Sequence, residues 1–106
     1  MGSFNFSDLP VGKAFVGTND RNIIVTFERI NSNTVRNLCF NPDNGHEVLR
    51  AEIPVGQGDT KLKRLDTDFW TVKVDGQVSS DVDLDKVRNV SVDANDNNRF
   101  VEISTN

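Results

Sequence analysis

The sequence predicts an all-β fold, an antiparallel β-sandwich of two sheets. Three observations support this prediction. Apolar residues recur at a period of two rather than at the helical period, the apolar runs are rich in β-branched and aromatic side chains, and turn-forming residues separate the runs. About eight short strands joined by hairpins are typical of an antiparallel sandwich or barrel.

The N-terminal half contains the first four predicted strands, at residues 13–18, 22–30, 34–40 and 46–53. Residues 13–18 form a short apolar run that begins with a lysine. Residues 22–30 alternate an apolar face with a mixed one, and residues 34–40 end in a polar–apolar alternation. Residues 46–53 begin with polar side chains and end in an apolar one, as expected of a strand that leaves a hairpin.

The C-terminal half contains four more predicted strands, at residues 60–65, 69–74, 86–92 and 99–104. The alternation is irregular in 60–65 and regular in 69–74. In 86–92 Val90 and Val92 share one face, and 99–104 is an apolar run that closes the fold. Residues 81–86 are expected to form a single helical turn.

Turn chemistry separates these strands. Asn, Asp, Ser, Pro and Gly concentrate at residues 18–20, 31–33, 42–45 and 95–98. Asp75-Gly76 is the strongest hairpin signal, because both residues tolerate the positive φ angles of a two-residue turn. With no linker, repeat or low-complexity tract, residues 1–106 are predicted to form a single domain.

Composition excludes several partner classes. The 12 basic and 16 acidic residues give a net charge of −4, whereas nucleic-acid binding normally needs a basic face. We therefore expect no nucleic-acid partner. No segment approaches the ~18 apolar residues of a membrane span, and the N-terminus lacks the features of a signal peptide. We expect no membrane insertion, and either a cytoplasmic location or export by an unconventional route to an extracellular one.

Catalysis is not expected. His46 is the single histidine, so the chain has one candidate general base near neutral pH. Cys39 lies between two apolar residues with no basic neighbour to lower its pKa. No serine occurs in a nucleophile-elbow sequence. We predict neither an enzyme nor a cofactor.

Metal binding has a weak signal. Asp81, Asp83 and Asp85 alternate, but an EF-hand loop would need Gly and Glu where Lys86 and Val92 stand. A polar turn is the favoured interpretation, and no metal site is predicted.

Trp70 has two interpretations, a ring-stacking platform for a ligand or a core residue. It shares its predicted strand face with Val72 and Val74, which favours the core.

Polar side chains crowd around one predicted hairpin, between residues 37 and 50. Amide and carboxylate oxygens accept hydrogen bonds and Arg and His donate them, which suits the hydroxyls of a sugar. A solvated hairpin without a ligand, in which Glu47 and Arg50 pair with each other or with water, stays open as the alternative. The candidate carbohydrate-binding residues are Asn37, Asn41, Asp43, His46, Glu47 and Arg50.

This stretch resembles the galectins, and more broadly the legume-lectin-like (L-type) lectins. Residues 38–43 resemble the family's His-x-Asn-Pro-Arg motif, with Cys39 at the His position and Asp43 at the Arg position. Glu47 to Arg50 resembles the following Glu and Arg pair. The resemblance continues through residues 53–58 and 69–76 into the last two strands. Because His, Arg and the stacking Trp are missing, it does not imply β-galactoside specificity.

The resemblance implies a reduced concanavalin A-like or galectin-like sandwich that acts as a lectin. We expect a haemagglutinin-like carbohydrate-binding domain that recognises glycans on glycoproteins or cell surfaces, as in cell adhesion. Cross-linking would need two sites, and a homodimer formed through sheet edges would supply them. The alternatives are a protein–protein interaction domain and a calcium-dependent surface domain, each without a sugar site.

Overall fold

The computed structural model describes residues 4–57, 59–60, 63–64, 68–79, 81–95 and 97–106; for residues 4, 47–49, 59–60 and 63–64 it describes the backbone only. Within these ranges every regular element is a β-strand or a short 3-10 turn, which confirms the all-β prediction. No helix among them is long and apolar enough to cross a membrane.

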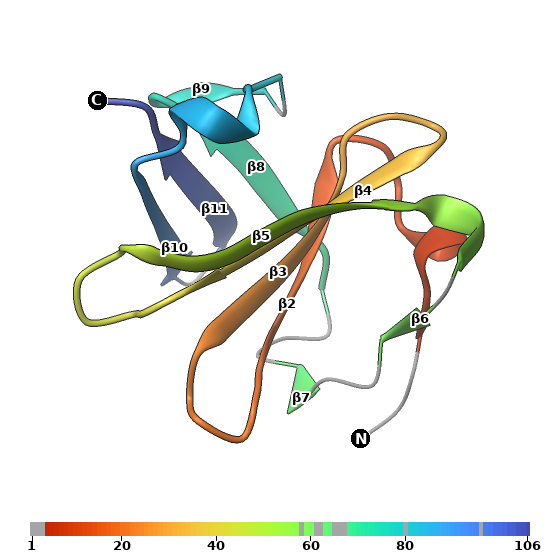
Figure 1. Cartoon of the computed structure of the whole chain (residues 1–106), viewed down its shortest axis with the longest axis horizontal. Coiled ribbons are helices and arrows are strands. Elements are labelled where there is room, and N and C mark those ends of the chain that lie inside the picture. The colour runs from red at the N-terminus through yellow and green to blue at the C-terminus, as the bar shows by residue number, and fades with distance from the viewer. Residues whose placement is uncertain (1–3, 58, 61–62, 65–67, 80, 96) are drawn as a thin grey trace.

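The described residues begin with a strand and a 3-10 turn, and most of the elements that follow are strands (Figure 1). The strands are β1 (Phe4–Asn5), β2 (Lys13–Thr18), β3 (Ile24–Arg29), β4 (Thr34–Phe40), β5 (Glu47–Pro54), β6 (Asp59–Thr60), β7 (Lys63–Arg64), β8 (Trp70–Val74), β9 (Gln77–Val78), β10 (Asn89–Asn95) and β11 (Asn98–Ser104). The 3-10 turns are η1 (Phe6–Asp8), η2 (Val55–Gln57) and η3 (Leu84–Lys86).

One continuous mixed sheet dominates the fold, in the order β10-β11-β8-β2-β3-β4-β5. β7 pairs with β2, β9 pairs with β8, and β1 and β6 form a separate small ladder. Figure 1 shows the meander β2–β5 crossing the molecule, with β8, β10 and β11 gathered at one end.

The predicted sandwich of two antiparallel sheets is therefore not confirmed. β8 pairs with β2 and joins both halves of the chain into one sheet, and β11 runs parallel to β8. After β8 the chain returns through β9, passes through η3 and enters the β10–β11 hairpin, which brings β11 back beside β8 in the same direction. Period-two patterns do not specify which strands become neighbours, so this pairing was not predictable.

Strand positions largely agree with the sequence. Residues 13–18 and 34–40 are strands with the predicted bounds, while β3 begins two residues late because Asn22 adopts a φ of 61°. The predicted helical turn within 81–86 is η3, and β10 therefore begins later than predicted. The predicted strand 60–65 falls partly outside the described residues.

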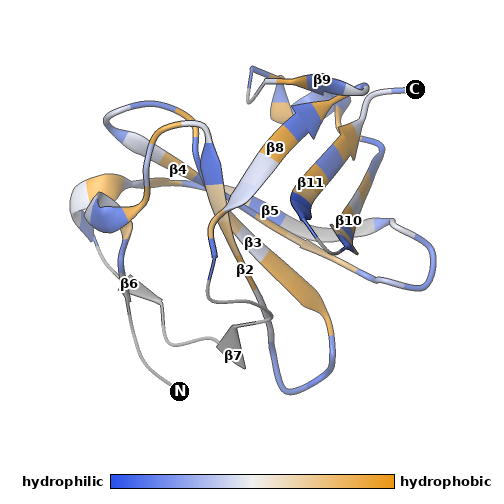
Figure 2. Ribbon diagram, turned by 180° about the vertical axis from the view of Figure 1, so that it is seen from behind, coloured by the Kyte–Doolittle hydropathy of each residue, from blue (hydrophilic) through white to orange (hydrophobic). Residues whose placement is uncertain are grey.

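Two apolar clusters cover the two faces of β2–β4, which explains why these strands are buried on both sides. Figure 2 shows the corresponding hydrophobic colouring along them. One cluster lies between the meander and the C-terminal strands. The other is closed by Phe6 and Leu9 near the N-terminus and by Val55 of η2. The termini of the meander are thus held by packing as well as by the hydrogen bonds of the sheet.

Trp70 lies in the first cluster and is 2% exposed, which confirms the core prediction. Its neighbours in that cluster include Val72, as alternation predicts. The Trp70 ring is therefore not available to stack on a ligand in this structure.

Glu28 and Arg36 form an ion pair inside this apolar cluster, directly opposite each other on β3 and β4. Arg36 Nε and Nη2 each lie 2.8 Å from Glu28 Oε2, and Arg36 Nη1 donates to the Val82 carbonyl at 3.0 Å. Among the described residues Glu28 Oε1 has no hydrogen-bond partner, and the neighbouring Thr26 hydroxyl donates to the Leu38 carbonyl at 3.2 Å. Burial raises the pKa of Glu28 above 4.5, although the Arg36 charge opposes this.

Candidate functional site

The predicted polar hairpin is present as the loop between β4 and β5, and its asparagines shape the turn. Asn41 Oδ1 accepts from the Asp43 amide at 2.9 Å, and Asn44 Oδ1 accepts from the His46 amide at 2.8 Å. Gly45 adopts a φ of 75° and its amide donates to the Asn41 carbonyl at 2.8 Å. These asparagine oxygens therefore hold the turn and have less capacity left for a ligand.

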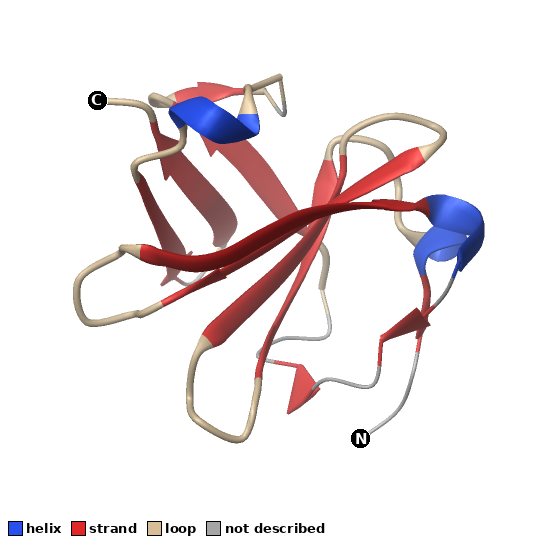
Figure 3. Ribbon diagram, in the orientation of Figure 1, coloured by secondary structure: helices blue, strands red, loops and turns tan. Residues whose placement is uncertain are grey.

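The loop lies against the first residues of β10 (Figure 3). The Val90 amide donates to the Gly45 carbonyl at 2.8 Å. A Cβ atom at Gly45 would lie 3.2 Å from the Val90 carbonyl oxygen and 3.8 Å from the Asn89 Cβ. Asp43 and His46 are exposed in this loop.

The other predicted site residues do not join one cluster. Arg50 pairs with Leu38 in the ladder and Asn37 pairs with Ala51, so alternation places Arg50 and Asn37 on opposite faces of the sheet. Arg50 Nη1 donates to the Leu84 carbonyl, and its Nη2 lies 3.6 Å from Asp85 Oδ1.

Asn37 is half-buried, and its Oδ1 lies 3.9 Å from the thiol of Cys39. The side chain of Glu47 lies outside the described residues.

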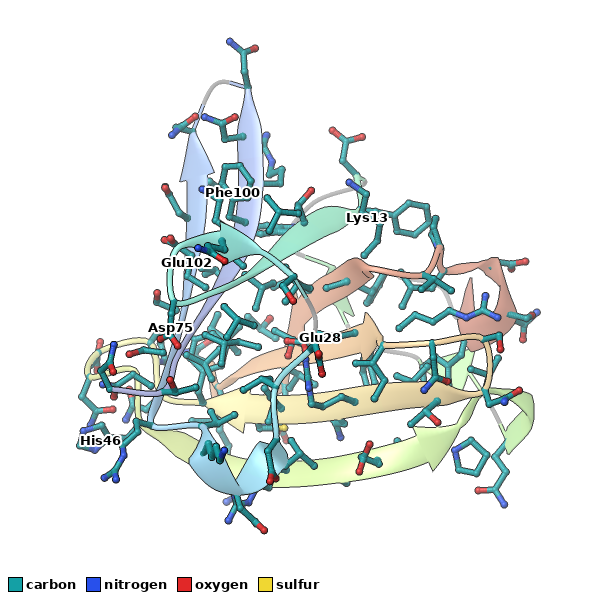
Figure 4. The ribbon with its side chains drawn as sticks, turned by 90° about the horizontal axis from the view of Figure 1, so that it is seen from above. Lys13, Glu28, His46, Asp75, Phe100 and Glu102 are labelled. Atoms are coloured by element: carbon teal, nitrogen blue, oxygen red, sulfur yellow. The ribbon has the colours of Figure 1, made fainter. Side chains whose placement is uncertain are left out.

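A second polar surface lies on the C-terminal strands, and we call it the outer face. Alternation turns the apolar residues of β8, β10 and β11 inward to the core and leaves polar side chains outside. Figure 4 shows Phe100, Glu102 and Asp75 following one another along this side, with His46 at the end of the neighbouring loop. The outer face consists of Lys13, Thr71, Lys73, Asn89, Ser91, Asp93, Asn95, Phe100, Glu102 and Ser104.

Phe100 is the aromatic residue of the outer face and is half-buried. The Lys73 ammonium lies 3.8 Å from the centre of its ring. On the adjoining β2, the Lys13 ammonium donates to the Thr71 hydroxyl at 2.8 Å. The two lysines thus concentrate positive charge around Phe100 and Thr71.

An open depression of about 350 Å³ lies at the opposite end of the outer face. It extends from the β8–β9 turn across β11 to β10. Its polar lining residues are Asp75, Asn89, Ser91, Glu102, Ser104 and Asn106. Because Asn89 also lies against Gly45, the loop between β4 and β5 borders this depression.

The β8–β9 turn positions one wall of the depression. Asp75 and Gly76 have φ angles of 50° and 85°, which confirms the predicted two-residue hairpin turn. Asp75 Oδ1 accepts from the Thr105 amide at 2.9 Å and Oδ2 from the Thr105 hydroxyl at 2.5 Å. These hydrogen bonds lower the pKa of Asp75 below 3.8, so its carboxylate stays charged at neutral pH.

The outer face was missed by the sequence reasoning, although a signal was present. Alternate positions of residues 89–95 are Asn, Ser, Asp and Asn, opposite the valines that predicted the strand. The closeness of these polar residues to Asp75 depends on the parallel pairing of β8 and β11.

The structure supplies little for nucleophilic or metal chemistry. Cys39 is buried, and burial raises the pKa of its thiol, which disfavours the reactive thiolate. Among the residues that the structure describes, no three His, Cys, Asp or Glu side chains are grouped to hold a metal ion.

Comparison with known proteins assigns no family. No protein-family model matches the chain, and neither the curated proteins nor the solved structures contain a significant match. The geometry of the outer face is therefore the basis for assigning a function.

Proposed function

We propose that this chain is a non-catalytic carbohydrate-binding domain, and that its ligand lies across the outer face. The observation that carries the proposal is the depression of about 350 Å³, lined by amides, hydroxyls and carboxylates. Sugar hydroxyls both donate and accept hydrogen bonds, and this lining offers both functions beside an apolar surface. The volume lies at the small end of ligand pockets, which suits one or two sugar rings.

Phe100 supports the proposal as an apolar contact for the C–H face of a sugar. The Lys73 ammonium covers its ring in the free protein. An exposed cation–π contact contributes about 0.5–1 kcal/mol, so displacing Lys73 costs little. The released ammonium then becomes a hydrogen-bond donor at the edge of the site.

The loop between β4 and β5 supports the site from one side. Asn41 shapes it, and Asp43 and His46 are exposed next to the depression that Asn89 lines. Asn37 and Arg50 have no role in the proposed site, because neither residue lines the depression.

The affinity of one such open site is expected in the micromolar to millimolar range, since water competes for each hydrogen bond. A haemagglutinin-like lectin would therefore need a homodimer or a second site for cell attachment.

A glycan array followed by NMR titration of the amide resonances tests the proposal. Binding is expected to shift amides of β10, β11 and the loop 41–46, and Ser91→Ala is expected to weaken it. Ser32→Ala is the matched control, because Ser32 is exposed in the turn between β3 and β4, outside the outer face. If no glycan shifts these amides, or if both variants act alike, the proposal is wrong.

A protein–protein interaction domain is the second candidate. The observation in its favour is that β5 and β10 end the sheet order. Edge strands can pair with another chain. Analytical ultracentrifugation of the chain alone and NMR shifts confined to β5 would favour this candidate over a sugar site.

A further inference from the structure

The depression at the end of the outer face has an uneven charge. Among its polar side chains, those of Asp75 and Glu102 are carboxylates, and the others are neutral amides and hydroxyls. Among the described residues that line it, none is basic. The positive charge of the outer face lies instead near Phe100, where the Lys73 ammonium is positioned.

Neither carboxylate is neutralised by a cation within the depression. Asp75 accepts two hydrogen bonds from the uncharged Thr105, which hold its orientation. Glu102 has no hydrogen bond or ion pair within the described part of the chain. Its partner in the β8–β11 register is Lys73, whose ammonium lies over the Phe100 ring. The two negative charges are thus left to act on a ligand.

We propose that this depression is a subsite for the protonated amine of an amino sugar. The inference rests on the proposed carbohydrate function and names the class of sugar. An ammonium group donates three hydrogen bonds and matches the carboxylates of Asp75 and Glu102, while the remaining hydroxyls meet Asn89, Ser91 and Ser104. A uronic or sialic acid would place a third negative charge in the same depression and is repelled.

NMR titration of the full chain tests this with four probes: glucosamine, glucose, glucuronate and cyclohexylammonium, at a pH that keeps the amines protonated. Glucosamine is expected to bind about 2 to 5 times more tightly than glucose, which is the gain from one exposed ion pair. Glucuronate is expected to bind more weakly than glucose. The advantage of glucosamine decreases as salt concentration rises.

Glu102→Gln keeps the shape of the side chain and removes one charge. It is expected to lower the ratio of glucosamine to glucose affinity, while Asp75 keeps part of the preference. Glu52→Gln is the matched control, because Glu52 is exposed on β5, outside the depression.

The inference is overturned if glucose and glucosamine bind equally or if Glu102→Gln leaves the ratio of their affinities unchanged. Equal binding of all three sugars would overturn it and leave the carbohydrate function standing. Binding of cyclohexylammonium alone would refute the carbohydrate function and with it the amino sugar. Shifts by none of the four probes would refute both.

Discussion

The buried ion pair of Glu28 and Arg36 provides the sharpest test of the fold. We expect Arg36→Met to destabilise the protein, since methionine keeps much of the length of the side chain and removes its charge. Glu28 is 0% exposed and Arg36 is 1% exposed, so neither charge can be hydrated in the folded state. The variant leaves the Glu28 carboxylate buried without a cation.

The magnitude follows from the contacts that are lost. Arg36 makes two contacts of 2.8 Å with Glu28 Oε2 and donates to the Val82 carbonyl at 3.0 Å. Removing one partner of a buried ion pair typically costs about 3–5 kcal/mol, because the other charge stays desolvated. Since Glu28 Oε1 already lacks a hydrogen-bond partner among the described residues, only the Thr26 side chain remains to stabilise the carboxylate.

Urea unfolding monitored by Trp70 fluorescence measures this cost, because Trp70 is 2% exposed and becomes hydrated on unfolding. The double variant Glu28→Leu with Arg36→Met is the control. Replacing both charges by apolar groups is often neutral or stabilising by about 1–4 kcal/mol. The double variant is therefore expected to be more stable than Arg36→Met alone.

The same pair predicts a pH dependence. The pKa of Glu28 is raised in the folded state, so the folded protein binds its proton more tightly than the unfolded chain does. The stability that Glu28 contributes is therefore present at low pH and decreases as pH rises from 4.5 through the raised pKa. Glu28→Gln is expected to remove this decrease.

Two results would refute this reasoning. One is a change of less than about 1 kcal/mol in Arg36→Met, the size of an exposed ion pair. The other is a double variant no more stable than the single one.

Three further predictions test the core, the loop and the turn. Trp70→Ala is expected to cost about 3–5 kcal/mol in urea unfolding monitored by circular dichroism, because it leaves a cavity in the first apolar cluster; a cost below about 1 kcal/mol would contradict the core position. Gly45→Ala is expected to cost about 1–3 kcal/mol, because its φ is 75° and the added Cβ would lie 3.2 Å from the Val90 oxygen. The control Gly56→Ala, where a Cβ meets nothing within 4 Å, should be close to neutral. Thr105→Val removes the hydroxyl bond that most lowers the pKa of Asp75, so an NMR titration of that carboxyl should show its pKa rising toward 3.8; an unchanged pKa would disprove that cause.

Alternation predicted the positions of the strands more reliably than it predicted which strands pair with each other. The faces of β8 were correctly assigned because buried and exposed positions in a strand differ at a period of two, and Trp70 followed from that. The Asp75-Gly76 turn followed from local backbone chemistry. The parallel β8–β11 pair joins segments far apart along the chain, which no local pattern specifies.

For the candidate site, too, the sequence predicted the local structure but not which side chains come together. The polar loop 41–46 was predicted from its composition, and the structure contains it. Whether its flanking side chains meet was decided by register: Arg50 faces Leu84 and Asp85, while Asn37 lies on the other side of the sheet. The burial of Glu28 with Arg36 was not predicted, because charged residues in a strand are ordinarily taken as exposed.

The sequence by itself determined an all-β chain, most strand positions, the turns and the core position of Trp70, because each depends on residues a few positions apart. Only the tertiary structure decided that one sheet is continuous and that Glu28 pairs with Arg36 inside the core. It also placed Asp75 beside Glu102 at one depression. These features depend on long-range pairing of strands, whose free energy comes from burial and hydrogen bonds shared between distant segments.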